Sequence, residues 1–176
     1  MPARAVTNRY GGTHIIGQFP SLKMGCMVPF ESRLEMDCLY LLDYDPLVMA
    51  FEAQPLVITY PDDKRTRQYV PDVRVQLQPP LAPILLECKP TNRLEEPANQ
   101  RKFAAAHIWC AAHGIQFAVV TDDLLREGVY LANVKRLAQF ARHPVDCKFA
   151  ENCITLLGQS PQKSLGLGEL AARVSP

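Results

Sequence analysis

The sequence predicts an α/β protein in which a mixed central sheet lies between helices and a short helical tail follows. The first observation is the order of elements: a helix, a group of strands, a long helix and a further strand. The strand, long helix and strand at the end of this series form a βαβ unit. The second observation is the composition, with 48% hydrophobic and 21% charged residues, which is typical of a globular protein. A chain of 176 residues can bury one main core.

The first helix is expected over residues 30–43, after an N-terminal arm that spans residues 1–29. Glycine, proline and basic residues are scattered through the arm, which favours an irregular segment. In the helix, apolar residues recur at helical spacing at Leu34, Cys38, Leu41 and Leu42. Pro46 would prevent the helix from continuing.

Short strands are expected next, separated by proline-rich or charged turns. They cover residues 48–52, 56–60, 68–77 and 84–89. A long helix should span residues 96–113, because Pro97 suits its first turn and Gly114 its end. A buried strand over residues 115–120 follows. Thr121 would then cap another helix that extends to Arg142.

These elements suggest an N-terminal arm (1–29), a main domain (30–126) and a helical C-terminal extension (127–176). The extension, with short helices expected at residues 151–157 and 167–174, would suit partner binding or a rudimentary winged-helix-like region. The formal net charge of +1 lacks the basic excess of a protein that grips nucleic acid alone. We expect a cytoplasmic protein without a membrane span, because long apolar stretches and a signal peptide are missing and the cysteines form no CxxC pair.

Asp72, Glu87 and Lys89 carry the clearest chemical signal. Glu87 and Lys89 are two positions apart on a predicted strand, so their side chains leave the same face while Cys88 points away. Carboxylates supply the oxygen ligands that Mg²⁺ prefers, and a nearby lysine can orient a water nucleophile or stabilise charge on a phosphate. The pattern predicts a Mg²⁺-dependent phosphodiesterase, with Mn²⁺ able to substitute. Asp72, Glu87 and the backbone carbonyl of Cys88 would bind the metal.

A third carboxylate is expected from the first helix. Glu35 lies within the apolar stripe of that helix, where an unpaired carboxylate would be costly and a metal ion would remove the cost. Glu31 lies one turn earlier, where an acidic residue is explained by the helix dipole. We therefore prefer Glu35 as the ligand and keep Glu31 as its substitute.

The same acidic residues could be ordinary surface charges, since an aspartate followed by Glu-x-Lys arises often by chance. The context favours a nuclease. Glu87 and Lys89 end a strongly apolar strand, Asp72 follows Pro71 within a preceding strand, and a long helix begins soon afterwards.

Longer motifs around these residues resemble the TnsA family, the endonuclease subunits of heteromeric cut-and-paste transposases. The resembling stretch runs from about Glu31 to Thr121. Its motifs are Ser32-Arg33-Leu34-Glu35, Phe51-Glu52-Ala53-Gln54-Pro55, Tyr69-Val70-Pro71-Asp72, Leu86-Glu87-Cys88-Lys89-Pro90 and Phe117-Ala118-Val119-Val120-Thr121-Asp122. Their order is more specific than the short pattern of two acids and a lysine.

The resemblance implies a restriction-endonuclease-like fold and Mg²⁺-dependent cleavage of the 5′ strands at transposon ends. It implies a TnsB-like transposase and a TnsC-like ATPase as partners, and no nucleotide cofactor for this chain. By position, the site residues are Glu35, Asp72, Glu87 and the catalytic lysine Lys89. Glu87 stands where the best-known family member has glutamine, which makes a fuller metal site. The C-terminal extension is shorter than the domain through which family members often contact the ATPase.

Six basic residues are candidates for DNA contacts, although each could equally belong to a solvated turn or helix face. They are Lys64, Arg65, Arg67, Arg93, Arg101 and Lys102. For Gln54, a buried amide that hydrogen-bonds the backbone is favoured over a contact with DNA or with the active site. Two other functions stay open: a stand-alone restriction, repair or junction-resolving nuclease, and a non-catalytic assembly module of a transposition complex.

Overall fold

The computed structural model describes residues 15–62, 65–161 and 166–174. The chain divides into two compact units, one ending at Ala138 and the other beginning at Gln139. Both boundaries suggested by the sequence, after residues 29 and 126, lie within the first unit.

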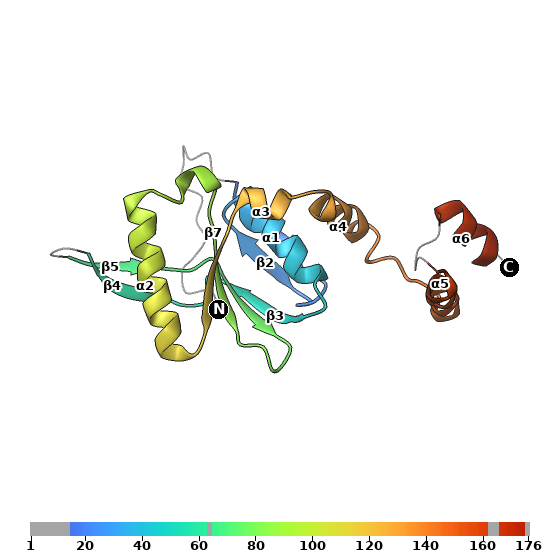
Figure 1. The fold of residues 1–176 in the computed structure, drawn as a ribbon, viewed down its shortest axis with the longest axis horizontal. Coiled ribbons are helices and arrows are strands. Elements are labelled where there is room, and N and C mark those ends of the chain that lie inside the picture. Colours follow the sequence, from blue (N-terminus) through green and yellow to red (C-terminus); the bar gives the residue numbers. More distant parts are fainter. Residues whose placement is uncertain (1–14, 63–64, 162–165, 175–176) are drawn as a thin grey trace. The chain divides into compact units, whose positions relative to one another are not determined.

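The first unit contains most of the secondary structure (Figure 1). Its described elements are β1 (Gly17–Pro20), β2 (Met27–Phe30), α1 (Arg33–Tyr44), β3 (Val48–Ala53), β4 (Ile58–Asp62), β5 (Arg65–Tyr69), β6 (Val73–Leu77), β7 (Ile84–Cys88), the 3₁₀ helix η1 (Thr91–Arg93), α2 (Pro97–His113), β8 (Gln116–Val120), α3 (Asp122–Arg126) and α4 (Tyr130–Ala138). The two long helices match the predicted ones within three residues at each end.

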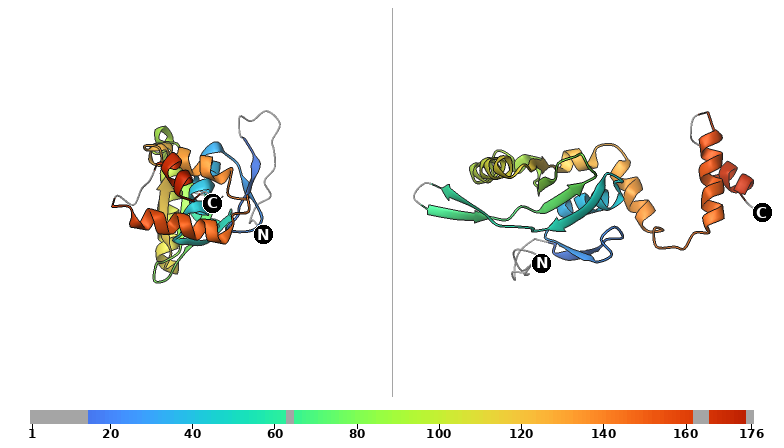
Figure 2. Two further views of the ribbon diagram at one scale, coloured as in Figure 1. Left: turned by 90° about the vertical axis from the view of Figure 1, so that its right-hand side faces the viewer. Right: turned by 90° about the horizontal axis from the view of Figure 1, so that it is seen from below.

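The centre of this unit is a mixed sheet of four described strands in the order β3-β6-β7-β8. Strand β6 pairs antiparallel with both β3 and β7, and β8 runs parallel to β7. The hairpin β4–β5 extends away from this sheet alongside α2 (Figures 1 and 2). The predicted α/β class, with a mixed sheet flanked by helices, is confirmed and is consistent with a restriction-endonuclease-like fold.

Helices α1 and α2 lie on different sides of β7 (Figure 1). Leu86 of β7 belongs to a core with Leu39 of α1, whereas Leu85 belongs to a second core with Ala106 of α2. Because side chains alternate along a strand, Glu87 leaves β7 on the same face as Leu85. The alternation therefore turns this acidic residue toward the side of α2 and the β4–β5 hairpin.

The prediction that residues 1–29 form an irregular arm is wrong for the second half of this segment. Strands β1 and β2 pair as an antiparallel hairpin, and Phe19, Val28 and Phe30 of this hairpin are buried in the core with α1. Glycine and proline residues obscure the alternation of apolar residues on which strand prediction depends. Residues 1–14 of the expected arm lie outside the described part of the chain.

Two predicted elements are each divided in the structure. The strand expected over residues 68–77 is interrupted at Pro71-Asp72, which separates β5 from β6. The helix expected between Thr121 and Arg142 is interrupted at Gly128, whose φ of +62° lies in the left-handed region that glycine tolerates. The divisions produce the short elements β5, β6, α3 and α4.

A buried aspartate joins α1 to the end of the first unit. Asp37 of α1 is 3% exposed, and its carboxylate accepts hydrogen bonds from Arg126 of α3, at 3.3 Å, and from Lys135 of α4. A buried carboxylate needs such partners, because removing it from water is costly. Helices α3 and α4 are thus attached to the main core by charge pairing.

The second unit contains α5 (Cys147–Gln159) and α6 (Leu167–Val174). Helix α5 is longer than the expected residues 151–157, because Asp146 caps its N-terminus by accepting a hydrogen bond from the Phe149 amide at 3.0 Å. Among the described residues, no helix has the length and apolar character needed to cross a membrane.

Replacing Leu85 tests the packing of β7 against α2. Leu85 is 0% exposed, so Leu85→Ala is expected to lower the free energy of unfolding by about 2–5 kcal/mol through lost burial and a cavity. Leu81→Ala, at a position that is 47% exposed, is the matched control and should cost less than about 1 kcal/mol. Urea denaturation of the two variants measures both values. Equal losses would contradict the packing described.

Candidate active site

Asp72, Glu87 and Lys89 come together around one cavity, as the sequence predicts. The cavity has a volume of about 440 Å³ and lies between β7, the β4–β5 hairpin and α2. Its lining residues are Val57, Gln68, Tyr69, Val70, Asp72, Glu87, Lys89 and Lys102. Two carboxylates and two ammonium groups therefore share one small space.

Glu87 is the most enclosed of these charged groups, with 3% of its surface exposed. The phenol of Tyr69 donates a hydrogen bond to its Oε2 at 2.7 Å. The Nζ of Lys89 lies 3.0 Å from its Oε1. Both carboxylate oxygens therefore have a donor, which reduces the cost of burying the charge.

Asp72 is held at the edge of β7 by the main chain. Its Oδ2 accepts a hydrogen bond from the Cys88 amide at 2.7 Å, and its backbone carbonyl accepts one from the Gln54 amide at 2.8 Å. Burial raises the pKa of Asp72 well above its ordinary value, and the charges of Glu87 and Glu35 raise it further. The carboxylates of Asp72, Glu87 and Glu35 thus repel one another.

Glu35 has a local partner that the sequence interpretation overlooked. Ser32 caps α1 and accepts a hydrogen bond from the Glu35 amide at 3.1 Å. The Glu35 carboxylate reaches back to the Glu31 amide at 2.7 Å and the Ser32 hydroxyl at 2.9 Å. This reciprocal pattern is a capping box, which the Ser-x-x-Glu spacing could have indicated. The carboxylate is therefore paired without a metal ion.

Glu35 nevertheless remains electrostatically close to the other acids. Burial raises the pKa of Glu35, and the charges of Glu31 and Glu87 act in the same direction. The geometry thus brings Asp72, Glu87 and Lys89 to one cavity and leaves Glu35 beside it, engaged in the cap of α1.

The donor set at this cavity suits a hard divalent cation. It consists of carboxylate oxygens from Asp72 and Glu87, and a cation between them would relieve the repulsion of the carboxylates. Within the described residues, however, no three His, Cys, Asp or Glu side chains are gathered closely enough to hold a metal ion. The two cavity carboxylates fit Mg²⁺ as a pair, and further ligands would have to come from backbone, water or substrate.

The basic residues predicted to contact DNA differ in whether a carboxylate already pairs with their positive charge. Arg67 and Arg101 both pair with the buried carboxylate of Asp62, and the Arg101 contact is 2.8 Å. Arg93 pairs with Glu96 at 2.7 Å. Lys102 lines the acidic cavity, with its Nζ 6.0 Å from the centre of the Tyr69 ring. Arg65 is exposed on β5, and Lys64 lies outside the described residues.

Two supporting contacts could not be read from local sequence. Tyr69 reaches Glu87 only because the β4–β5 hairpin folds alongside α2. Asp122 accepts hydrogen bonds from the amide of Thr91 at 2.8 Å and from its hydroxyl at 3.0 Å. The second contact ties the segment after Lys89 to the start of α3. Both depend on tertiary structure rather than on spacing.

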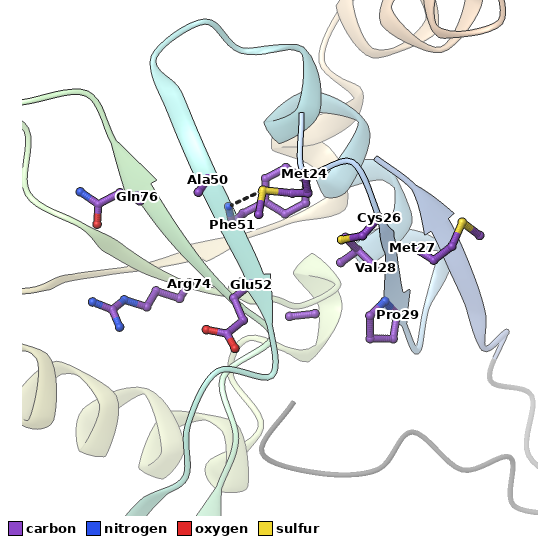
Figure 3. Close-up of a pocket in the computed structure, with 11 residues that line it drawn as sticks. Met24, Cys26, Met27, Val28, Pro29, Ala50, Phe51, Glu52, Arg74 and Gln76 are labelled. Atoms are coloured by element: carbon purple, nitrogen blue, oxygen red, sulfur yellow. Dashed lines mark hydrogen bonds between the residues drawn. The ribbon is translucent and has the colours of Figure 1, made fainter. Parts of the chain in front are cut away.

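A second cavity, of about 480 Å³, lies beside β3 and shares no lining residue with the acidic one (Figure 3). Met24, Val28 and Pro29 line it on the side of the β1–β2 hairpin, and the Phe51 amide donates a hydrogen bond to the Met24 sulfur at 3.4 Å. Its walls are mainly apolar, and Glu52 and Arg74 are its charged members. The acidic cavity is therefore the better candidate for hydrolytic chemistry.

Comparison with known families identifies the part of the chain that carries this site. Residues 45–122 match the family model described as TnsA-like endonuclease N terminal. This stretch is similar to the N-terminal domain of TnsA-like endonucleases. The matched stretch includes Asp72, Glu87 and Lys89 but begins after Glu31 and Glu35. No curated protein matches the chain.

The match confirms the resemblance to the TnsA family. It covers less than half of the chain, and the matched residues include all those that line the cavity. Within the matched stretch, the motifs Tyr69-Val70-Pro71-Asp72 and Leu86-Glu87-Cys88-Lys89-Pro90 supply most of the charged lining. Metal binding and the individual roles of these residues stay predictions.

The raised pKa of Asp72 predicts how stability depends on pH. The folded protein binds the proton of the Asp72 carboxyl group more tightly than the unfolded chain does. The stabilisation that this proton provides is therefore present below about pH 4 and is lost as pH rises through the folded pKa of Asp72. Asp72→Asn cannot ionise and still accepts the Cys88 hydrogen bond. In EDTA, it is expected to raise the free energy of unfolding at pH 7, and to raise it by less at pH 4.

Urea denaturation at both pH values measures this difference. Asp123→Asn, at an exposed position on α3, is the matched control and should change stability equally little at either pH. A stabilisation by Asp72→Asn that is the same at pH 4 and pH 7 would show that charge repulsion is not its cause.

Proposed function

We propose that this chain is a Mg²⁺-dependent DNA endonuclease subunit of a transposase, which hydrolyses the 5′ strand at each transposon end. A TnsB-like transposase and a TnsC-like ATPase would be its partners. The observation that carries the proposal is the convergence of Asp72, Glu87 and Lys89 on one cavity within the stretch that matches the TnsA-like endonuclease model.

Asp72 and Glu87 are the proposed metal ligands, together with the backbone carbonyl of Cys88. Glu35 is the proposed further acidic group. To bind the metal, its carboxylate would have to give up a hydrogen bond to the Glu31 amide or to the Ser32 hydroxyl. When bound, Mg²⁺ supplies a more acidic water and stabilises negative charge on the phosphate. The hydrogen bonds from Cys88 to Asp72 and from Tyr69 to Glu87 would keep these carboxylates oriented.

Lys89 is the proposed cation that stabilises the scissile phosphate. Burial lowers its pKa, but the nearby charges of Glu87 and Asp72 outweigh this effect, so that the pKa lies above its ordinary value. A lysine in this condition is protonated at neutral pH. It would therefore act by attracting the negative charge that develops during hydrolysis, rather than by removing a proton from water.

The basic residues around the cavity support a limited role in DNA binding. Lys102 faces the cavity and is well placed for a phosphate. Arg67 and Arg101 already share the carboxylate of Asp62, which leaves less of their charge for DNA. With a net charge of +1, the chain would depend on its transposase partner to select the DNA end.

Cleavage of strand-labelled transposon-end DNA by the full chain, with both partners and Mg²⁺, tests this function. Asp72→Ala and Lys89→Ala are each expected to lower 5′-strand cleavage by about a hundredfold or more, since the first removes a proposed metal ligand and the second the cation that stabilises the phosphate. Asp123→Ala and Lys148→Ala change exposed residues of the same types and should cut like the unaltered protein. Addition of EDTA should abolish the reaction.

The outcomes separate the competing functions. Cutting of the same DNA without the partners would indicate a stand-alone nuclease. A complex that cuts only the 3′ strands, while still requiring this chain, would indicate an assembly module. Normal 5′ cleavage by Asp72→Ala and Lys89→Ala would show that the active site has been assigned to the wrong residues.

A further inference from the structure

Gln54, at the end of β3, combines three unfavourable features in one residue. Its φ is +51°, in the left-handed region that residues other than glycine and asparagine rarely adopt. The residue is 6% exposed, and its amide oxygen is buried without a hydrogen-bond partner among the described residues. Pro55 follows directly and narrows the conformations open to Gln54.

The contacts of Gln54 connect two parts of the acidic site. Its backbone amide donates to the Asp72 carbonyl at 2.8 Å, and its Nε2 donates to Oε1 of Glu31 at 3.0 Å. The charge of Glu31 acts on Glu35, and the charge of Glu35 acts on Asp72. Gln54 therefore lies between the start of α1 and Asp72, which directly precedes β6.

The orientation of the Gln54 amide follows from its partner. An ionised carboxylate can only accept hydrogen bonds, so the NH₂ group must face Glu31 and the carbonyl oxygen must face elsewhere. A rotation of the Gln54 amide that exchanged its nitrogen and oxygen would place the amide oxygen against the carboxylate oxygen of Glu31. The buried oxygen without a partner is thus a consequence of holding Glu31.

These features are difficult to explain by stability alone. Glycine or asparagine would adopt the left-handed conformation more readily, and an apolar side chain would leave no buried carbonyl unsatisfied. Strained residues with unsatisfied polar groups are found preferentially where function requires them. Gln54 bonds to Glu31 and to the main chain of Asp72, so the positioning of these acidic residues is a function that could require it.

We propose that Gln54 is a positioning residue of the nuclease site. Its amide nitrogen holds Glu31 toward the acidic cluster, and its amide oxygen accepts a hydrogen bond from water that a bound divalent cation retains. Mg²⁺ keeps several of its waters in protein sites, and neutral amide oxygens are suitable acceptors for them. This inference rests on the metal-dependent function proposed above.

Binding of Mn²⁺ alone to the full chain, measured by isothermal titration calorimetry without DNA, tests the proposal. Gln54→Leu removes both amide contacts at similar volume and is expected to weaken Mn²⁺ binding about tenfold or more. The melting temperature of the metal-free protein should change little, because removal of the unsatisfied buried oxygen offsets the loss of the hydrogen bond to Glu31. Gln76→Leu, at an exposed glutamine of β6, should change neither quantity.

A second variant covers the case in which Gln54→Leu does not fold. Gln54→Asn suits the left-handed conformation better, but it withdraws the amide from Glu31 by one methylene group. We expect it to fold at least as stably as the unaltered chain and still to bind Mn²⁺ more weakly. Unchanged Mn²⁺ binding in both variants, or lowered melting temperatures with unchanged binding, would overturn the proposal.

Asp72→Ala distinguishes this inference from the function on which it rests. If Asp72→Ala loses Mn²⁺ binding while the Gln54 variants retain it, only the role given to Gln54 is wrong. If Asp72→Ala binds Mn²⁺ as the unaltered protein does, the metal site itself is wrong, and the inference about Gln54 is overturned with it.

Discussion

The burial of Glu87 on the central strand is the constraint on which the arrangement of the site depends. A carboxylate with so little access to water needs donors, and the structure supplies Tyr69 from the β4–β5 hairpin and Lys89 from the end of β7. The hairpin must therefore lie beside α2, where Tyr69 packs in the second core. The same pairing leaves Lys89 beside Asp72 in the acidic cavity. One buried charge thus links the placement of a peripheral hairpin to the composition of the site.

Much of the fold follows from patterns within short stretches of sequence. The helical spacing of apolar residues predicts α1, and Pro97 and Gly114 mark the two ends of α2. The alternation along β7 correctly separates Glu87 and Lys89 from Cys88, which is buried in the other core. These predictions succeed because each depends on periodicity or on a residue with restricted backbone conformations.

Other features depend on contacts between distant residues or on signals that competed with one another. The hairpin β1–β2 is stabilised by burial of its aromatic residues, which glycine and proline content alone does not reveal. The interruption at Pro71-Asp72 becomes understandable only when the Gln54 amide is seen to bond to the Asp72 carbonyl. Glu35 is a different case. The Ser-x-x-Glu signature of a capping box is present in the sequence, but a capping box and a metal site both require a carboxylate at this position, so the residue type does not distinguish them.

The pairing of Asp37 with Arg126 and Lys135 defines the smallest fragment that could be expected to fold independently. The family match ends at residue 122, and the sequence alone suggested a boundary after residue 126. A fragment ending at either position would lack Lys135, leaving a carboxylate that is almost wholly buried with an incomplete set of counter-charges. Leu131 and Val134 of α4 would be removed with it, although both are buried. The autonomous folding unit therefore extends through α4, and the limits of the catalytic motifs are not the limits of the domain.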